Sequence, residues 1–114
     1  MTRPTLLLTA LAVLLAVAGC GHSWDWKQAD LDRNRLNLGL FRGADTGEKL
    51  GTWVRQGEVV ATAGATGSDE IAVVVRYERQ VDEPFGTPTV ETACYRFTPD
   101  EDGSNVDFGR TDCP

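Results

Sequence analysis

The chain of 114 residues has little of what most catalytic and metal sites require. It has one histidine, His22, and three cysteines, Cys20, Cys94 and Cys113. A nucleophile system built on histidine would have to use His22, and a zinc site would need several histidine or cysteine ligands. The glycines form no GxGxxG or P-loop pattern. We therefore predict no catalytic residue, no metal and no cofactor.

Basic residues are also few, with 11 Lys and Arg against 17 Asp and Glu and a net charge of −6. Nucleic-acid binding and electrostatic attachment to anionic lipid both need a basic face, so neither is expected. Residues 100–104 are acidic but lack the spacing of a calcium loop. Carboxylates are abundant, and because glycosidases use pairs of them, a small carboxylate-dependent envelope hydrolase is kept as an alternative.

The first residues have the pattern of a targeting segment. Arg3 supplies a positive charge, and the run from Leu6 to Val17 is apolar except for Thr9. This run is shorter than the roughly 20 residues that a spanning helix needs, and it suits the apolar core of a signal peptide.

The segment Val17-Ala18-Gly19-Cys20 resembles the lipobox of bacterial lipoproteins. The resemblance implies cleavage between Gly19 and Cys20, a diacylglyceryl group on the Cys20 thiol and a further acyl chain, such as palmitate, on the new amino terminus. Residues 1–19 would then be a removed signal peptide, and the mature chain would be anchored to the outer face of the cell membrane. An ordinary secretory signal or an uncleaved anchor helix fits the apolar run alone, but neither explains the position of Cys20.

Lipidation of Cys20 would leave Cys94 and Cys113 as a matched pair in an exported, disulfide-permissive environment, so we predict a disulfide between them. Removal of Arg3 with the leader would change the net charge from −6 to −7.

Residues 20–28 are predicted to be a tether, and residues 29–114 a single extracytoplasmic domain. Trp24 and Trp26 either rest at the level of the lipid headgroups or cap the domain core. In residues 29–43, Leu36, Leu38 and Leu40 alternate with polar or small residues, which favours a short strand, although a helix beginning near Leu31 also fits.

Residues 45–48 resemble a capping box, which predicts a helix that continues through Leu50 and Trp53 towards Gly64. The alternative is a hairpin with strands at 52–55 and 58–62 and a turn at Gln56-Gly57.

Later segments alternate with period two, which predicts strands at about 71–78, 89–98 and 105–110. If Val75 faces Tyr95, then Arg79 faces Glu91 and the two form a cross-strand ion pair; an anion-binding face built from Arg76, Arg79 and Arg96 is the less favoured reading. If Cys94 lies directly opposite Cys113, the last turn is centred between Gly103 and Ser104.

The segment Cys94-Tyr95-Arg96-Phe97-Thr98 and the ending Asp112-Cys113-Pro114 resemble small lipoproteins of actinobacteria, a likeness that covers residues 50–114 and carries no activity. The expected fold is α+β, with one helix on an antiparallel sheet of three to four strands and a disulfide that closes the last hairpin. The expected function is a membrane-anchored, non-catalytic binding or scaffolding module of the cell envelope. An accessory or inhibitory subunit of a larger envelope protein is a further alternative.

Overall fold

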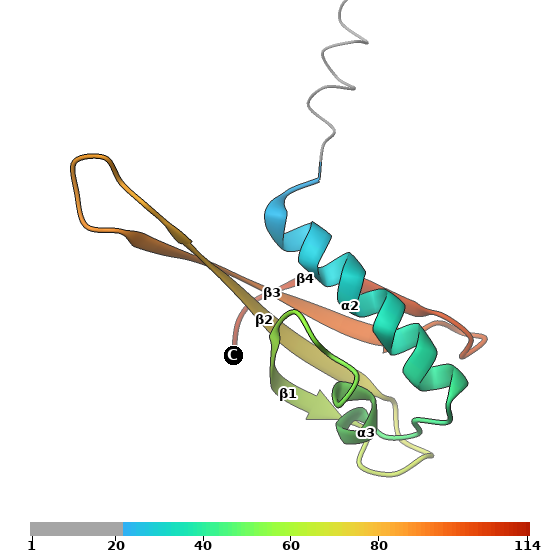
Figure 1. Cartoon of the computed structure of the whole chain (residues 1–114). Coiled ribbons are helices and arrows are strands. Elements are labelled where there is room, and N and C mark those ends of the chain that lie inside the picture. Colours follow the sequence, from blue (N-terminus) through green and yellow to red (C-terminus); the bar gives the residue numbers. More distant parts are fainter. Residues whose placement is uncertain (1–21) are drawn as a thin grey trace, which may run out of the picture.

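The computed structural model describes residues 22–114, which form two helices and one four-stranded antiparallel sheet (Figure 1). The sheet order follows the chain, β1-β2-β3-β4, and both helices cover the same face. The elements in chain order are α2 (Trp24–Phe41), α3 (Gly47–Gly51), β1 (Glu58–Ala63), β2 (Ala72–Val81), β3 (Thr89–Pro99) and β4 (Val106–Thr111). The predicted fold class, a helix on a small antiparallel sheet, is confirmed.

Helix α2 begins at Trp24, inside the segment predicted to be a tether. The Ser23 side chain caps it by accepting a hydrogen bond from the Trp26 amide, which satisfies one of the free N–H groups of the first turn. The folded domain therefore starts before residue 29, and the predicted boundary is corrected to Ser23. The segment 29–43 is helical up to Phe41, so the short strand favoured there is wrong.

The face of α2 that packs on the sheet explains this error. Its buried positions recur every three or four residues, as they must on one side of a helix. Two of them are aspartates, one is alanine and one is glycine, so the stripe has almost no hydrophobic signature. The buried residues are Asp25, Ala29, Asp32, Leu36 and Gly39.

The predicted helix is present, but it starts one residue later than a capping box at residues 45–48 implies and is much shorter than expected. Thr46 is its N-cap and accepts from the Lys49 amide, and the helix ends at Gly51. The chain then turns into β1 at Glu58. The second strand of the hairpin alternative is thus present, whereas residues 52–55 form no strand.

The predicted pairing of the two long strands is confirmed. Val75 lies opposite Tyr95 and Arg79 lies opposite Glu91, with Arg79 and Glu91 joined by an ion pair of 2.7 Å. Alternation along both strands sends Val73, Val75 and Tyr77 of β2, and Tyr95 and Phe97 of β3, towards the helices, where they are buried.

The predicted disulfide Cys94–Cys113 is present, with its Cα atoms 5.2 Å apart. The predicted register is wrong, however, because Cys94 pairs with Thr111 and not with Cys113. Cys113 lies two residues beyond this pair, past the end of β4, and the disulfide fastens the chain end to the side of β3. The β3–β4 turn is accordingly centred between Asp102 and Gly103.

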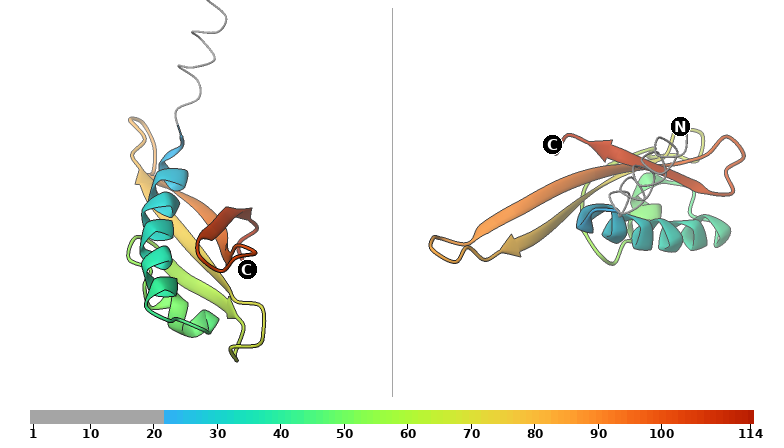
Figure 2. Two further views of the ribbon diagram at one scale, coloured as in Figure 1. Left: turned by 90° about the vertical axis from the view of Figure 1, so that its right-hand side faces the viewer. Right: turned by 90° about the horizontal axis from the view of Figure 1, so that it is seen from above.

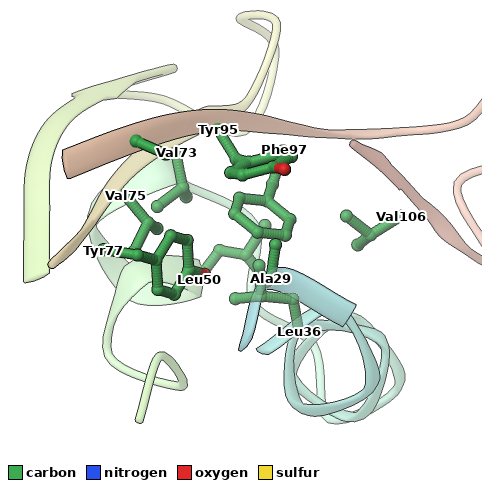
Figure 3. Close-up of a cluster of buried hydrophobic side chains, with 10 residues drawn as sticks. Ala29, Leu36, Leu50, Val73, Val75, Tyr77, Tyr95, Phe97 and Val106 are labelled. Carbon is green, nitrogen blue, oxygen red and sulfur yellow. The ribbon is translucent and has the colours of Figure 1, made fainter. Parts of the chain in front are cut away.

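One hydrophobic core lies between the helices and the sheet (Figure 3). Full burial of a leucine, valine or phenylalanine side chain contributes about 1.5–3 kcal/mol, so these residues supply most of the driving force for folding. Its members are Ala29, Leu36, Leu50, Val73, Val75, Tyr77, Ala93, Tyr95, Phe97 and Val106.

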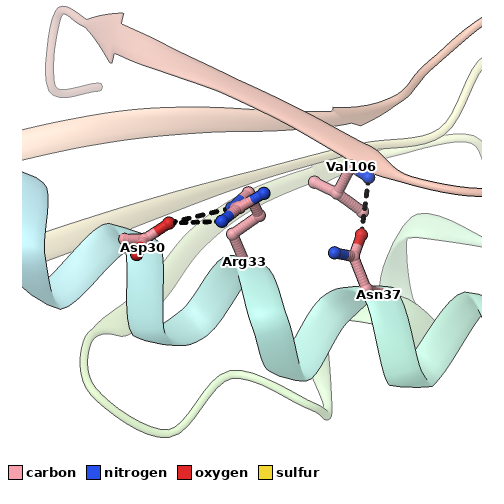
Figure 4. A network of polar contacts seen from close by, with 4 residues as sticks. All are labelled: Asp30, Arg33, Asn37 and Val106. Carbon is pink, nitrogen blue, oxygen red and sulfur yellow. Dashed lines mark hydrogen bonds and ion pairs between the residues drawn. The ribbon is translucent and has the colours of Figure 1, made fainter.

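Polar groups attach α2 to the edge strand β4 (Figure 4). The Asn37 side-chain oxygen accepts a hydrogen bond of 2.6 Å from the Val106 amide, where β4 begins. One turn earlier, Arg33 bonds Asp30 within the helix and places its guanidinium 5.7 Å from the Phe108 ring centre. These contacts fix the position of β4 under the middle of the helix.

The far halves of β2 and β3 leave the domain as a two-stranded arm (Figure 1). From Glu78 to Thr92 every residue is exposed except the half-buried Val81. In Figures 1 and 2 the arm extends well past the helix that covers the rest of the sheet. No helix or strand of the described residues packs on its outer part.

Candidate functional site

Two buried carboxylates on α2 meet two tyrosines of the sheet. The Tyr77 hydroxyl donates to Asp32 at 2.8 Å, and the Tyr95 hydroxyl donates to Asp25 at 2.7 Å. Asp32 is 0% exposed and Asp25 is 3% exposed. Since the aspartates are seven residues apart on one helix face and the tyrosines sit on neighbouring strands, the two bonds fasten α2 to the centre of the sheet.

Asp32 also organises the chain between α3 and β1. Its carboxylate accepts from the backbone amides of Arg55 (2.8 Å), Gln56 (2.9 Å) and Gly57 (3.2 Å). With Tyr77 this makes four donors around one buried charge, which offset the cost of removing it from water. Burial, with the hydrogen bond to Asp32, raises the Tyr77 pKa far above its ordinary value.

The close approach of this turn to the core requires a glycine. A Cβ at Gly57 would lie 2.5 Å from Val75 Cγ1 and 2.6 Å from Tyr77 Cε1. Gly57 therefore lets the backbone reach Asp32 without displacing the core.

Asp25 lies at the start of α2 in a different environment. Burial alone would raise its pKa, but hydrogen bonds from Ser23 and Tyr95 and the charge of Arg110 outweigh burial, so the pKa lies below its usual range. Burial and the bond to Asp25 raise the Tyr95 pKa from 10.0 to about 12. The pair is therefore an ionised carboxylate and a neutral phenol at neutral pH.

A cleft of about 400 Å³ opens beside this pair and contains a second carboxylate, Glu91. Each carboxylate in the cleft has an arginine partner: Glu91 pairs with Arg79 at 2.7 Å, and Asp25 pairs with Arg110 at 3.6 Å. A general acid of the kind used in glycoside hydrolysis needs a raised pKa, whereas that of Asp25 is lowered. The lowered pKa of Asp25 and its ion pair with Arg110 therefore do not suit the role of a general acid.

His22, Trp24 and Trp26 lie together at the start of α2. His22 is exposed and stacks on Trp26 with ring centres 3.6 Å apart. Trp24 and Trp26 pack against the core, and Arg79 lies over the Trp24 ring at 5.1 Å. Of the two readings for these tryptophans, the structure places them as caps of the core.

Metal ligands are not gathered anywhere in residues 22–114, where no group of three His, Cys, Asp or Glu side chains is close enough to hold an ion. In the acidic turn, Asp100 instead accepts from the backbone amide of Ser104 at 3.2 Å. Within the same residues, no helix is long and apolar enough to cross a membrane.

The sheet face turned away from the helices is open. Arg76 on this face pairs with Glu58 and Glu78. Arg96 is exposed on the same face and belongs to none of the ion pairs between described residues; it lines a shallow cleft of about 330 Å³ with Thr98 and Asp107. The three arginines considered from the sequence as an anion-binding face therefore do not act together. Arg76 and Arg79 form ion pairs with glutamates, whereas Arg96 forms none with a described residue.

Large apolar side chains are exposed at two places: on α2, where Phe41 is 84% exposed, and on the arm. Phe85 at its tip is 102% exposed and Val90 on β3 is 62% exposed. The tip carries Asp82 and Glu83, and neither forms an ion pair with a described residue. The strands predicted at about 71–78 and 89–98 did not reveal this projection, because the turn residues between them do not show how far a hairpin extends from the domain.

The predicted lipidation site Cys20 and the cleavage position at Gly19 lie outside the described residues. Comparison with protein-family models, curated proteins and solved structures finds no match to this chain.

Proposed function

We propose that this protein is an exported lipoprotein, anchored through Cys20 to the outer face of the cell membrane, whose domain is a non-catalytic binding or scaffolding module of the cell envelope. The observation that carries the anchoring is the Val17-Ala18-Gly19-Cys20 segment behind an apolar leader. The disulfide supports it, because Cys94 and Cys113 account for the other two of the three cysteines.

The arrangement of the carboxylates supports a binding role over hydrolysis. Asp25 and Asp32 are occupied as hydrogen-bond acceptors of Tyr95 and Tyr77, and Glu91 is occupied by Arg79. A hydrolase of this type needs one carboxyl held protonated and another directed at the substrate. Arg96 on the open sheet face forms no ion pair with a described residue, and this suits recognition of an acidic partner.

The anchoring is tested by replacing Cys20. The variant Cys20→Ser should leave the membrane fraction and lose labelling by a fatty-acid probe, since the thiol that carries the lipid is gone. Cys113→Ser is the matched control, and it should still be labelled and membrane-bound. Continued labelling of Cys20→Ser would contradict the proposal.

The binding role is tested on the open sheet face. We expect an acidic partner, recovered from solubilised membranes with the intact chain, to be lost from Arg96→Glu because its carboxylate or phosphate would meet a like charge. Arg42→Glu, an equal change of charge at the exposed end of α2, should retain it. Equal recovery with both variants would exclude Arg96 as the contact.

A further inference from the structure

The tip of the arm and the beginning of the described chain lie at the same end of the molecule. In Figure 1 and in the left view of Figure 2, the blue beginning of α2 and the β2–β3 turn are both towards the top, while the 64–71 loop is at the bottom. The view from above shows that the two upper points are well separated sideways (Figure 2). A flat surface placed against this end would meet the chain at both points.

The position of α2 sets how far the domain can stand from its proposed anchor. The helix is capped at Ser23, so residues 21 and 22 alone separate Cys20 from the cap. An extended residue spans at most about 3.6 Å, which keeps Ser23 within roughly 11 Å of the lipidated residue. With Cys20 lipidated, the end of the domain at which α2 begins lies next to the membrane.

Phe85 has the properties of an interfacial membrane contact. It is fully exposed at the tip, and its neighbours in the 84–88 turn are proline, glycine and threonine, which carry no charge. Segments that bind the membrane interface bury Phe, Trp and Leu side chains at the boundary between headgroups and acyl chains. Asp82 and Glu83 at the base of the turn exclude electrostatic attraction to anionic lipid, so the contact has to be apolar.

We propose that Phe85 inserts into the interface of the membrane that holds the lipid anchor, so that the domain is fixed at two points and its orientation is set. This inference rests on the proposed lipidation of Cys20. A protein partner is less favoured at the tip, because a stable interface buries about 800 Å² on each side and Phe85 is the one large apolar side chain in the 84–88 turn.

The test uses the full, lipidated chain reconstituted in phosphatidylcholine vesicles. Gly86→Cys introduces a thiol beside Phe85 for an environment-sensitive fluorophore, while Cys94 and Cys113 remain bonded. The position tolerates the change, because Gly86 has no positive φ and a Cβ there meets only Glu83 Cβ at 3.7 Å. Ala65→Cys, in the exposed loop at the opposite end, is the matched control.

Lipids brominated on their acyl chains should quench the fluorophore at position 86 and leave the one at position 65 unquenched. Adding Phe85→Ser to Gly86→Cys should abolish this quenching, with the circular dichroism spectrum unchanged. The mass of the amino-terminal peptide reports lipidation separately.

Lipidated protein whose position-86 fluorophore is not quenched would overturn the tip contact and leave the anchoring intact. Shielding of that fluorophore from aqueous iodide in native envelopes, without quenching by brominated lipid, would assign the tip to a protein partner and also overturn it. An unlipidated Cys20 would overturn both proposals.

Discussion

The hydroxyl of Tyr77 lies 2.8 Å from the carboxylate of Asp32, across 45 residues of chain, and both groups are buried. The same carboxylate holds three backbone amides of the turn that precedes β1. One side chain therefore joins α2, β2 and this turn, which makes Asp32 the position where a small change should be most costly.

Asp32→Ala should lower the free energy of unfolding by about 3 kcal/mol, because it leaves the buried Tyr77 hydroxyl and three partly buried backbone amides without an acceptor. Asp30→Ala on the same helix removes only the half-exposed ion pair with Arg33 and should cost less than about 1 kcal/mol. Urea unfolding followed by circular dichroism measures both. Similar losses for the two variants would show that the buried network is not important.

The two tyrosines should titrate abnormally. They are the only tyrosines in the chain, and both pKa values are raised, that of Tyr95 from 10.0 to about 12. Absorbance of phenolate at pH 10 should thus be far below the half-ionised level of ordinary tyrosine. Because folding favours the protonated form, the stability due to Tyr95 is complete below pH 10 and is lost between pH 10 and 12.

Asp25 gives the opposite dependence at acid pH. Its pKa is lowered in the folded protein, so folding favours the ionised form. The stability that it contributes is present above its ordinary value of 3.8 and is lost as the pH falls through the lower value of the folded state. Asp25→Asn should flatten the acid limb of a plot of unfolding free energy against pH. An unchanged acid limb would refute this role.

Removal of the disulfide should destabilise the domain without changing its fold. The double variant Cys94→Ala, Cys113→Ala releases a loop with a sequence separation of 19, for which the chain-entropy model gives roughly 3 kcal/mol. A fall in Tm of about 12–24 °C would correspond to this loss in a domain of this size. An unaltered Tm would show that the pairing of β3 with β4 keeps the chain end in place without the disulfide.

Gly39 and Gly51 form a matched pair of helical glycines. A Cβ at Gly39 would lie 2.6 Å from Trp53 Cδ1, so Gly39→Ala should displace the indole and cost about 1–3 kcal/mol. A Cβ at Gly51 meets nothing closer than 3.5 Å, and Gly51→Ala should be neutral or stabilising by up to about 1 kcal/mol. The Tm of Gly39→Ala reports the cost of the clash with Trp53, and the Tm of Gly51→Ala reports the gain in helix propensity.

Strands β2 and β3 were predictable because apolar residues recur at every second position, and this local pattern indicates a strand with one buried face. Helix α2 was not, because the aspartates in its buried stripe are matched by tyrosines 45 and 70 residues away, and no local pattern reports such pairs. The even spacing of Leu36, Leu38 and Leu40 was misleading, since Leu36 is fully buried while Leu38 is 40% exposed.

The pairing of the cysteines was predictable from their number, but their register was not. Opposed positions on two strands are one way to satisfy disulfide geometry, and a chain end that turns back beside the strand is another. The arm was missed for a related reason. Turn residues at 84–88 mark where a hairpin reverses, whereas its projection depends on where α2 stops covering the sheet.

Mass spectrometry of the amino-terminal peptide, from protein purified out of its own membrane, is the decisive measurement for the proposed anchoring. The peptide should begin at Cys20 and carry the mass of a diacylglyceryl group on the thiol. A peptide that begins upstream of Cys20, or one in which Cys20 is unmodified, would contradict the assignment of this protein as a membrane-anchored lipoprotein.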